Sequence, residues 1–355
     1  MQPENASNQE DMVLQIEQTA ARSRPRASDE IDATTRLALY RSQFEIRTVE
    51  KRAYDLFLQN LIKGTSHLAI GQEAIAAAFG ASMRPSDWSF CTYRGHAHTL
   101  ARGSSMTGVL GELMGRECGL MGGKGGSMHL TDVDRGVMGS YAIIGAHLPI
   151  AMGAAWSAQY RGTDQVAVCF FGDGTTNIGA FHEALSMASI WKLPVVFVCE
   201  NNLYMEYTPI SAVTPVKNPA ADRASAYGLD RILIDGNDAD EVYRTAQSAI
   251  ARARAGAGPS LIEALTYRHH GHSRADPAKY RPTEEVEAWM KRDPIPLYRQ
   301  RLIDFGVAES TILGVEEEIK QRVDQATEAA KASRPPADEL IHKDVWADGG
   351  WAWRN

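Results

Sequence analysis

The sequence has 355 residues, of which 44% are hydrophobic, and its 44 acidic residues outnumber its 37 basic residues to give a formal net charge of -7. This length allows one large α/β domain or two smaller ones, and the negative balance without a polybasic run argues against nucleic-acid binding. The four cysteines form no C-x-x-C pair, which fits a reducing compartment. No apolar stretch approaches the ~18 residues of a membrane span, and the N-terminal residues lack the apolar region of a secretory signal. We therefore expect a cytoplasmic protein.

The first predicted elements in chain order are helical. Residues 1–30 are polar and are expected to form a mobile arm, whereas residues 34–62 place apolar side chains at helical spacing. A second helix is expected at 70–82. The region 103–145 is rich in glycine, which predicts loops around a short helix at 106–114.

The middle of the chain alternates between apolar runs and helical patterns. Helices are expected at 177–191 and 239–255, and an amphipathic helix around Val315 and Val323 precedes a Trp-rich tail. The predicted strands are 166–171, 194–199, 231–234 and 260–265. Because strands joined by helices pair in parallel through right-handed crossovers, we expect an α/β fold with a parallel sheet flanked by helices.

Polar residues follow two neighbouring strands of this predicted sheet. Gly172-Asp173-Gly174 ends one strand, and Asn201-Asn202 ends the next. Ligands of parallel sheets bind at the carboxyl ends of the strands, and carboxylate and amide oxygens suit Mg²⁺. The glycines allow backbone N–H groups to approach a diphosphate, and we expect the following helix to direct its N-terminus at that charge. Each dipeptide alone indicates only a turn or a loop, but the whole unit predicts a site for Mg²⁺ and a diphosphate.

Other cofactor motifs fit less well. The Gly122–Ser127 loop is not a nucleotide P-loop, because Cys118 stands at the first glycine position of that motif and Gly125 at its Ser/Thr position. No G-x-G-x-x-G opens a helix after a strand, which disfavours NAD binding. The three histidines at 269, 270 and 272 have no accompanying cysteine or further carboxylate that would favour a metal site.

Several further motifs occur in a fixed order along the chain. They are Ser66-His67-Leu68-Ala69-Ile70-Gly71-Gln72-Glu73-Ala74, Thr92-Tyr93-Arg94-Gly95-His96, Gly122-Gly123-Lys124-Gly125-Gly126-Ser127-Met128-His129, Ile144-Gly145-Ala146 and His269-His270-Gly271-His272-Ser273. With the Asp173–Asn202 unit, they resemble the α subunits of the thiamine-diphosphate-dependent E1 components of pyruvate, branched-chain 2-oxo-acid and acetoin dehydrogenase complexes. The resemblance covers roughly residues 35–300.

The resemblance implies a thiamine-diphosphate-binding fold and assigns the metal and diphosphate contacts. Asp173, Asn202 and the backbone carbonyl of Tyr204 would hold Mg²⁺. Tyr93 and Arg94 would contact the diphosphate, and a planar guanidinium suits phosphate oxygens. An arginine in isolation would equally indicate a surface ion pair.

The resemblance also assigns contacts along the rest of the cofactor. Gly174 and Thr175 would offer backbone N–H groups. Ile144 would support the bent cofactor, and its backbone and that of Ala142 would meet the aminopyrimidine. The family commonly has glycine where Ala142 stands, a change that a backbone contact tolerates.

Two histidines match the active-site histidines of the family. His67 and His272 would be catalytic, with His272 close to the diphosphate, where a neutral imidazole can relay protons. A lone histidine would more often be a structural residue. Ser273 matches a position that is phosphorylated in some relatives, but here a loop serine is the favoured interpretation.

The resemblance places the thiamine-diphosphate domain at 31–300 and a C-terminal helical extension and tail at 301–355. Its motifs cover only the diphosphate half of the site. The glutamate that meets the aminopyrimidine would therefore come from a β subunit in an α₂β₂ heterotetramer. The implied reaction is oxidative cleavage of a 2-oxo acid or of acetoin, with acyl transfer to the lipoyl domain of an E2 protein.

Substrate choice depends on Glu206. A carboxylate facing the pocket would repel a 2-oxo acid and accept a hydrogen bond from a hydroxyketone, whereas a solvent-facing Glu206 leaves pyruvate open. Two further hypotheses remain. One is a thiamine enzyme not linked to E2, such as a decarboxylase or a transketolase-like half, and the other is a non-catalytic regulatory paralogue. The His269–Ser273 motif argues against the first, and intact Asp173 and Asn202 argue against the second.

Overall fold

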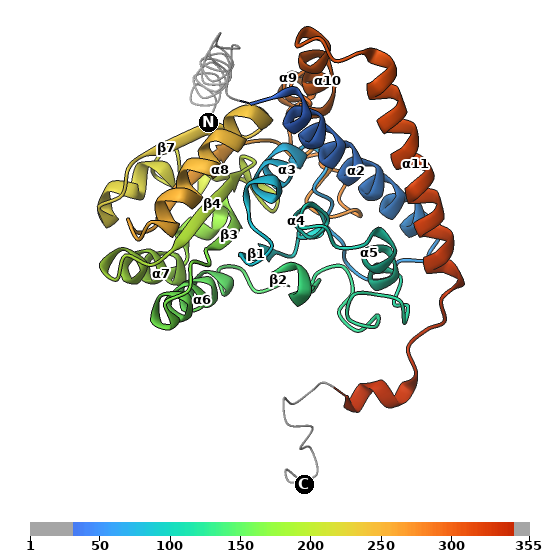
Figure 1. Ribbon diagram of the computed structural model, residues 1–355, viewed down its shortest axis with the longest axis horizontal. Coiled ribbons are helices and arrows are strands. Elements are labelled where there is room, and N and C mark those ends of the chain that lie inside the picture. Colours follow the sequence, from blue (N-terminus) through green and yellow to red (C-terminus); the bar gives the residue numbers. More distant parts are fainter. Residues whose placement is uncertain (1–30, 344–355) are drawn as a thin grey trace.

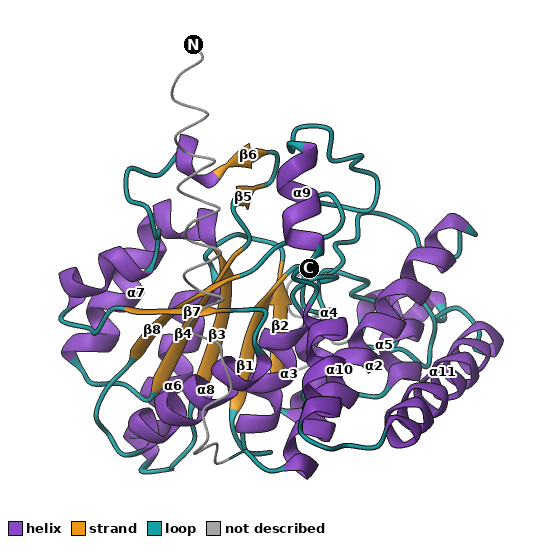
Figure 2. Ribbon diagram, turned by 90° about the horizontal axis from the view of Figure 1, so that it is seen from above, coloured by secondary structure: helices purple, strands orange, loops and turns teal. Residues whose placement is uncertain are grey.

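The computed structural model describes residues 31–343, so the predicted arm at 1–30 and the Trp-rich tail lie outside the described residues. Within that range a single twisted sheet is enclosed by helices (Figures 1 and 2). The helices are α2 (Ala33–Leu58), α3 (Glu73–Ser82), α4 (His96–Ala101), α5 (Met106–Leu113), α6 (His147–Arg161), α7 (Gly179–Ile190), α8 (Ala239–Arg254), α9 (Thr283–Met290), α10 (Pro294–Asp304) and α11 (Glu309–Ala332). The strands are β1 (Trp88–Thr92), β2 (Val137–Tyr141), β3 (Ala167–Gly172), β4 (Val195–Asn201), β5 (Tyr204–Met205), β6 (Thr208–Pro209), β7 (Ile232–Asp235) and β8 (Ser260–Leu265).

Six of these strands form one sheet in the order β2-β1-β3-β4-β8-β7. Every neighbouring pair is parallel, with Phe171 of β3 beside Cys199 of β4 and Asn201 of β4 beside Leu265 of β8. The carboxyl ends of β3, β4 and β8 therefore lie next to one another along one edge. This confirms the predicted parallel α/β fold and the predicted adjacency of the segments that follow these strands.

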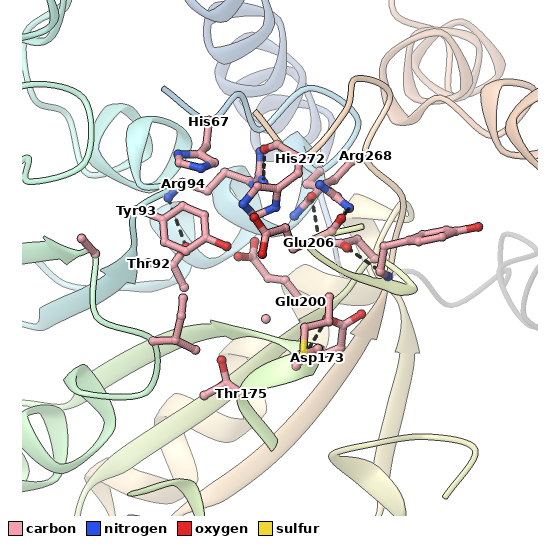
Figure 3. Close-up of a pocket in the computed structure, with 18 of the residues that line it drawn as sticks. His67, Thr92, Tyr93, Arg94, Asp173, Thr175, Glu200, Glu206, Arg268 and His272 are labelled. Atoms are coloured by element: carbon pink, nitrogen blue, oxygen red, sulfur yellow. Dashed lines mark hydrogen bonds between the residues drawn. The ribbon is translucent and has the colours of Figure 1, made fainter. Parts of the chain in front are cut away.

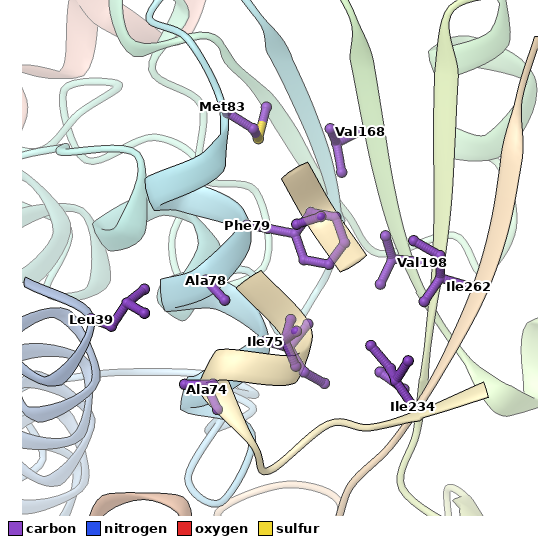
Figure 4. Packing of buried hydrophobic residues seen from close by; sticks show 14 of the residues in the cluster. Leu39, Ala74, Ile75, Ala78, Phe79, Met83, Val168, Val198, Ile234 and Ile262 are labelled. Carbon is purple, nitrogen blue, oxygen red and sulfur yellow. The ribbon is translucent and has the colours of Figure 1, made fainter. Parts of the chain in front are cut away.

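Both faces of the sheet are buried, which explains the continuous apolar runs in its central strands. Val168 and Phe170 of β3 pack on one face against α3 and α8, and Figure 4 shows Val168 and Phe79 in this layer. Phe79 meets Phe170 edge-on at a centroid distance of 5.3 Å. Cys169 and Phe171 point to the opposite face, against α6 and α7. Burying such a phenylalanine contributes about 2–3 kcal/mol relative to leaving it exposed. The two packed layers fix the strand ends that carry the polar residues.

A second group of helices packs beside the sheet. Helix α11 lies against α2 and α5 (Figure 1), and Arg41 of α2 pairs with Glu318 of α11. The predicted division at residue 300 remains a prediction. Helix α10 runs across that position, and its Tyr298 and Leu302 are buried with α2 and α3 in the core on the α3/α8 face of the sheet.

The predicted strands at 166–171, 194–199, 231–234 and 260–265 are present with shifts of at most two residues at their ends, and helix 34–62 ends at Leu58. The short helix predicted at 106–114 is confirmed as α5, but the loops predicted around it within 103–145 also contain β2. Strands β1 and β2 and helix α6 were not predicted. Strand β2 contains Gly139 and Ser140 and lies at the sheet edge, so its sequence has neither the alternation nor the apolar run of a typical strand.

Within residues 31–343 no helix combines the length and apolar character needed to cross a lipid bilayer.

Candidate active site

A cavity of about 620 Å³ opens at the carboxyl ends of β3, β4 and β8, where ligands of parallel sheets bind (Figure 3). All twelve residues selected from the sequence line it. They are His67, Tyr93, Arg94, Ala142, Ile144, Asp173, Gly174, Thr175, Asn202, Tyr204, Glu206 and His272. The chain positions that supply them span more than 200 residues, and the sheet brings them to one place.

One wall of the cavity carries an unpaired buried carboxylate oxygen. Asp173 follows β3 and is 2% exposed, and its Oδ1 accepts the N–H of Gly174 at 2.7 Å. Its Oδ2 is buried without a hydrogen-bond partner among the described residues, and burial raises the pKa of the carboxyl to about 6. An isolated buried carboxylate is costly, and a cation would remove that cost.

The second oxygen donor comes from the neighbouring strand. Asn202 follows β4, which pairs directly with β3. Its Nδ2 donates to Oε1 of Gln72 at 3.4 Å, which fixes the orientation of the amide, and its Oδ1 accepts the N–H of Tyr204 at 3.4 Å. A carboxylate oxygen and an amide oxygen on adjacent strand ends form a hard donor set that fits Mg²⁺.

A small hairpin encloses the same wall. Strands β5 and β6 pair antiparallel, with Tyr204 opposite Pro209, and Glu206 lies in the turn between them. Leu203 and Glu206 adopt φ values of 71° and 54°, in the left-handed region that residues with a side chain seldom occupy. Such strain concentrates at ligand-binding segments. The β5 strand of this hairpin contacts the 3₁₀ turn at Asp173–Asn177 that follows β3.

Basic and aromatic side chains form the opposite wall (Figure 3). Arg94 follows β1 and is buried, and it donates to the carbonyls of Leu68 at 2.5 Å and His272 at 2.9 Å. One guanidinium therefore ties three distant segments together. The ring of His67 lies 4.3 Å from that of Tyr93 and 4.9 Å from that of His272, measured between centroids.

Both histidines are held in the neutral form. Burial, reinforced by the positive charge of Arg94, lowers the pKa of His67 to about 2 and that of His272 to about 4. His67 Nδ1 is buried and has no hydrogen-bond partner within residues 31–343. As neutral imidazoles, the two rings can each donate and accept hydrogen bonds.

The glycine-rich loop at 121–126 is organised around a buried carboxylate instead of a phosphate. Glu112 of α5 accepts four backbone N–H groups at 2.6–3.2 Å, two on each carboxylate oxygen. The donors are Met121, Gly123, Gly125 and Gly126. Because these N–H groups donate to Glu112, they are not available to bind a phosphate as the N–H groups of a P-loop do.

The helix predicted at 177–191 is present as α7 (Gly179–Ile190), two residues shorter at its N-terminal end and one at its C-terminal end. A 3₁₀ turn covers Asp173–Asn177, and α7 begins only at Gly179. The N–H of Gly174 donates to Asp173. The rest of this tighter turn, residues 174–177, and Ile178 therefore separate Asp173 from the first turn of α7, and the approach of that helix N-terminus to a diphosphate remains a prediction.

The cavity is also lined by Gly172 of the predicted diphosphate unit. The sequence assigned no individual site role to the remaining lining residues, which are Gln72, Thr92, Met128, Asn177, Ile178, Glu200, Met205 and Arg268. Glu200 had a visible signal, since it is a carboxylate at the carboxyl end of a buried strand. Arg268 lies three residues beyond β8, in a segment that was expected at this edge of the sheet. The site role in this segment was instead assigned to His272.

Glu206 both lines the cavity and is exposed. Its backbone carbonyl accepts a hydrogen bond from Nη2 of Arg268 at 3.0 Å. The turn that carries Glu206 is thus fixed, while its role toward a substrate remains a prediction.

Comparison with known proteins gives a consistent result. Residues 40–339 match the family described as the dehydrogenase E1 component. The chain is 40% identical over 311 residues to the α subunit of the acetoin:2,6-dichlorophenolindophenol oxidoreductase of Bacillus subtilis, covering 87% of this chain and 93% of the relative. It is 37% identical over 311 residues to the pyruvate dehydrogenase E1 component subunit alpha of Rhizobium meliloti, covering 87% and 89%. The corresponding subunit of Zymomonas mobilis is 38% identical over 311 residues, covering 87% and 88%.

Proposed function

This chain belongs to the dehydrogenase E1 component family as a thiamine-diphosphate-dependent E1 α subunit, and from that premise we propose that its cavity holds the diphosphate end of the cofactor through Mg²⁺. The orphaned Oδ2 of buried Asp173 is the observation that carries the proposal. Asp173, Asn202 and the carbonyl of Tyr204 would bind the metal, and Tyr93 and Arg94 would face the diphosphate.

The cofactor supplies an electron sink for breaking the bond next to a substrate carbonyl. The residues of this chain bind and orient the groups around it. His67 and His272 are buried, neutral and in mutual contact, so near neutral pH they would act on the reacting groups as neutral hydrogen-bond donors and acceptors. Ile144 is 40% exposed at the cavity wall, which leaves an apolar surface available to support the cofactor.

A β subunit and an E2 protein are partners of E1 α subunits. We propose an α₂β₂ heterotetramer in which the β subunit brings a glutamate to the aminopyrimidine. In support, the motifs of this chain cover only the diphosphate half of the site, and Asp173 among the carboxylates that line the cavity is assigned to the metal. The acyl group formed in the reaction would pass to a lipoyl domain of E2.

The substrate we propose is a small 2-oxo acid or a hydroxyketone such as acetoin. The names of the relatives include both pyruvate and acetoin enzymes. Glu206 favours a hydroxyketone if its carboxylate turns inward, because it would repel a second carboxylate.

The experiment uses the chain copurified with its β subunit, Mg²⁺ and thiamine diphosphate. Reduction of an artificial electron acceptor is followed with pyruvate, branched-chain 2-oxo acids and acetoin in parallel. Turnover of acetoin alone would establish the hydroxyketone reading, and turnover of a 2-oxo acid would establish a decarboxylating E1. Failure of the copurified assembly to bind thiamine diphosphate would overturn the proposed function.

A further inference from the structure

Arg268 combines nearly complete burial with unused hydrogen-bonding capacity at the cavity. The residue is 1% exposed, and its Nη2 donates to the carbonyl of Glu206 at 3.0 Å. Its Nε and Nη1 are buried without a hydrogen-bond partner among residues 31–343. Leaving donors of a charged guanidinium unpaired is costly, so a site of this kind favours an acceptor from outside the chain.

The position of Arg268 directs that unused capacity to the reaction centre. Arg268 lines the cavity together with Asp173 and Arg94, and Figure 3 shows it on the His272 side. The positive charge of Arg268 interacts with the ionisable groups of Tyr93, Arg94, Asp173 and His272. Arg268 is therefore close enough to both walls of the cavity to affect charges on either side. Arg94, in contrast, already spends two N–H groups on backbone carbonyls.

From these contacts we infer that Arg268 is an anion-binding residue of the site, in which the Nε–H or the Nη1–H group donates to an anionic oxygen while Nη2 holds the Glu206 turn. This inference rests on the proposed function. The anionic oxygen belongs either to the cofactor diphosphate or to the carboxylate of a 2-oxo acid, and both present the same chemistry to a guanidinium.

The Arg268 side chain would therefore connect the bound anion to the β5–β6 hairpin. The carbonyl of Glu206 and the bound anion would occupy different nitrogens of a rigid planar group. Loading the anion therefore fixes the guanidinium plane and with it the turn between β5 and β6. Arg268 acts as a positioning residue for Tyr204, which lies in the same hairpin.

The test compares Arg268→Gln and Arg268→Lys in the assembly with the β subunit. Arg274→Gln is the matched control, since Arg274 is also buried in the same loop but does not line the cavity. Its Nε and Nη2 likewise have no hydrogen-bond partner in the part of the chain that the structure describes. Calorimetry measures the affinity for Mg²⁺–thiamine diphosphate, Mg²⁺–pyrophosphate and thiamine, and steady-state assays measure KM for pyruvate and acetoin.

If the diphosphate is the ligand, Arg268→Gln weakens binding of thiamine diphosphate and pyrophosphate about 10- to 100-fold and leaves thiamine unchanged. If the substrate carboxylate is the ligand, cofactor affinities stay the same and KM rises for pyruvate but not for acetoin. In either case Arg268→Lys recovers part of the lost binding, because lysine restores the positive charge but not the planar guanidinium.

Equal losses with thiamine and thiamine diphosphate, or no change with any ligand, would overturn the inference and leave Arg268 a support for the hairpin only. If the wild-type assembly binds no thiamine diphosphate, the proposed function fails. The pyrophosphate titration still decides on Arg268 in that case.

Discussion

Gly174 lies directly beneath the side chain of Met205, so that a Cβ added at Gly174 would come within 2.5 Å of Met205 Cγ. The backbone of Gly174 is therefore in contact with the β5–β6 hairpin that carries Tyr204. In this structure the second glycine of Gly172-Asp173-Gly174 is required by close packing between a strand end and a hairpin. Its φ does not lie in the left-handed region, so alanine would be excluded by space and not by backbone conformation.

Gly174→Ala is expected to displace the hairpin and to weaken Mg²⁺–thiamine diphosphate binding at least tenfold. Because the clash is with the flexible side chain of Met205, the second substitution Met205→Ala should restore most of the affinity. Calorimetry on the single and double variants gives the coupling between the two positions. A double variant as weak as Gly174→Ala would show that the lost contact is to the Gly174 backbone itself.

Asp173→Asn should separate stability from ligand binding. At pH 7 the wild-type carboxylate is ionised and buried, and Asn removes that charge with little change of shape. The ligand-free variant should therefore be as stable as the wild type or up to about 1–3 kcal/mol more stable. Mg²⁺–thiamine diphosphate binding should fall more than about 100-fold, as measured by calorimetry.

The control for this variant is Asp324→Asn, on an exposed aspartate that pairs with Arg52. It should leave cofactor affinity unchanged. Retained metal binding in Asp173→Asn would sink the metal assignment.

Much of the site was accessible from the sequence because two physical rules act together. Strands buried on both faces are continuous apolar runs, so β3, β4 and β8 were visible, and parallel topology brings their carboxyl ends together. The polar residues that follow β3 and β4 could then be placed side by side. Sequence reasoning could not see the hairpin contact between Gly174 and Met205, which depends on tertiary packing.

Other features were hidden for local reasons. Strand β1 contains Ser89 and Thr92 and is short, so propensity alone does not reveal it. The glycine loop could be excluded as a P-loop, but its true organiser, Glu112, lies on a preceding helix and carries no motif. Arg268 could not be predicted because its role depends on burial and on nitrogens left without a partner among residues 31–343, and both arise only when the chain folds.

His67 predicts a dependence of stability on pH. Its pKa is about 2 in the folded chain and 6.5 unfolded, because burial disfavours the charged imidazole. A lowered folded pKa gives stability that is fully present above pH 6.5 and is lost as pH falls, since only the unfolded chain then gains a proton. At pH 5, protonation of His67 in the unfolded chain lowers the free energy of unfolding by up to about 2 kcal/mol.

His67→Gln lacks that proton uptake. The difference in Tm between the variant and the wild type, measured by calorimetry on the ligand-free assembly, should therefore shift in favour of the variant between pH 7.5 and pH 5. An identical difference at both pH values would contradict the depressed pKa of His67.

Glu112 provides a test of how the loop at 121–126 is held. Its buried carboxylate accepts four backbone N–H groups, and removing it leaves them without an acceptor. Glu112→Ala should destabilise the chain by about 3 kcal/mol or more, even if water reaches part of the loop. Trypsin should then cut faster after exposed Lys124.

Glu117→Ala is the matched control, because Glu117 is exposed near the same loop and pairs with Arg334. It should change stability by less than about 1 kcal/mol and leave the rate of cleavage unaltered. Because Met128 follows the loop and lines the cavity, Glu112→Ala should also weaken thiamine diphosphate binding. Rapid cleavage without any loss of cofactor affinity would show that the loop is organised independently of the cavity wall, and equal cleavage of both variants would show that Glu112 does not organise the loop at all.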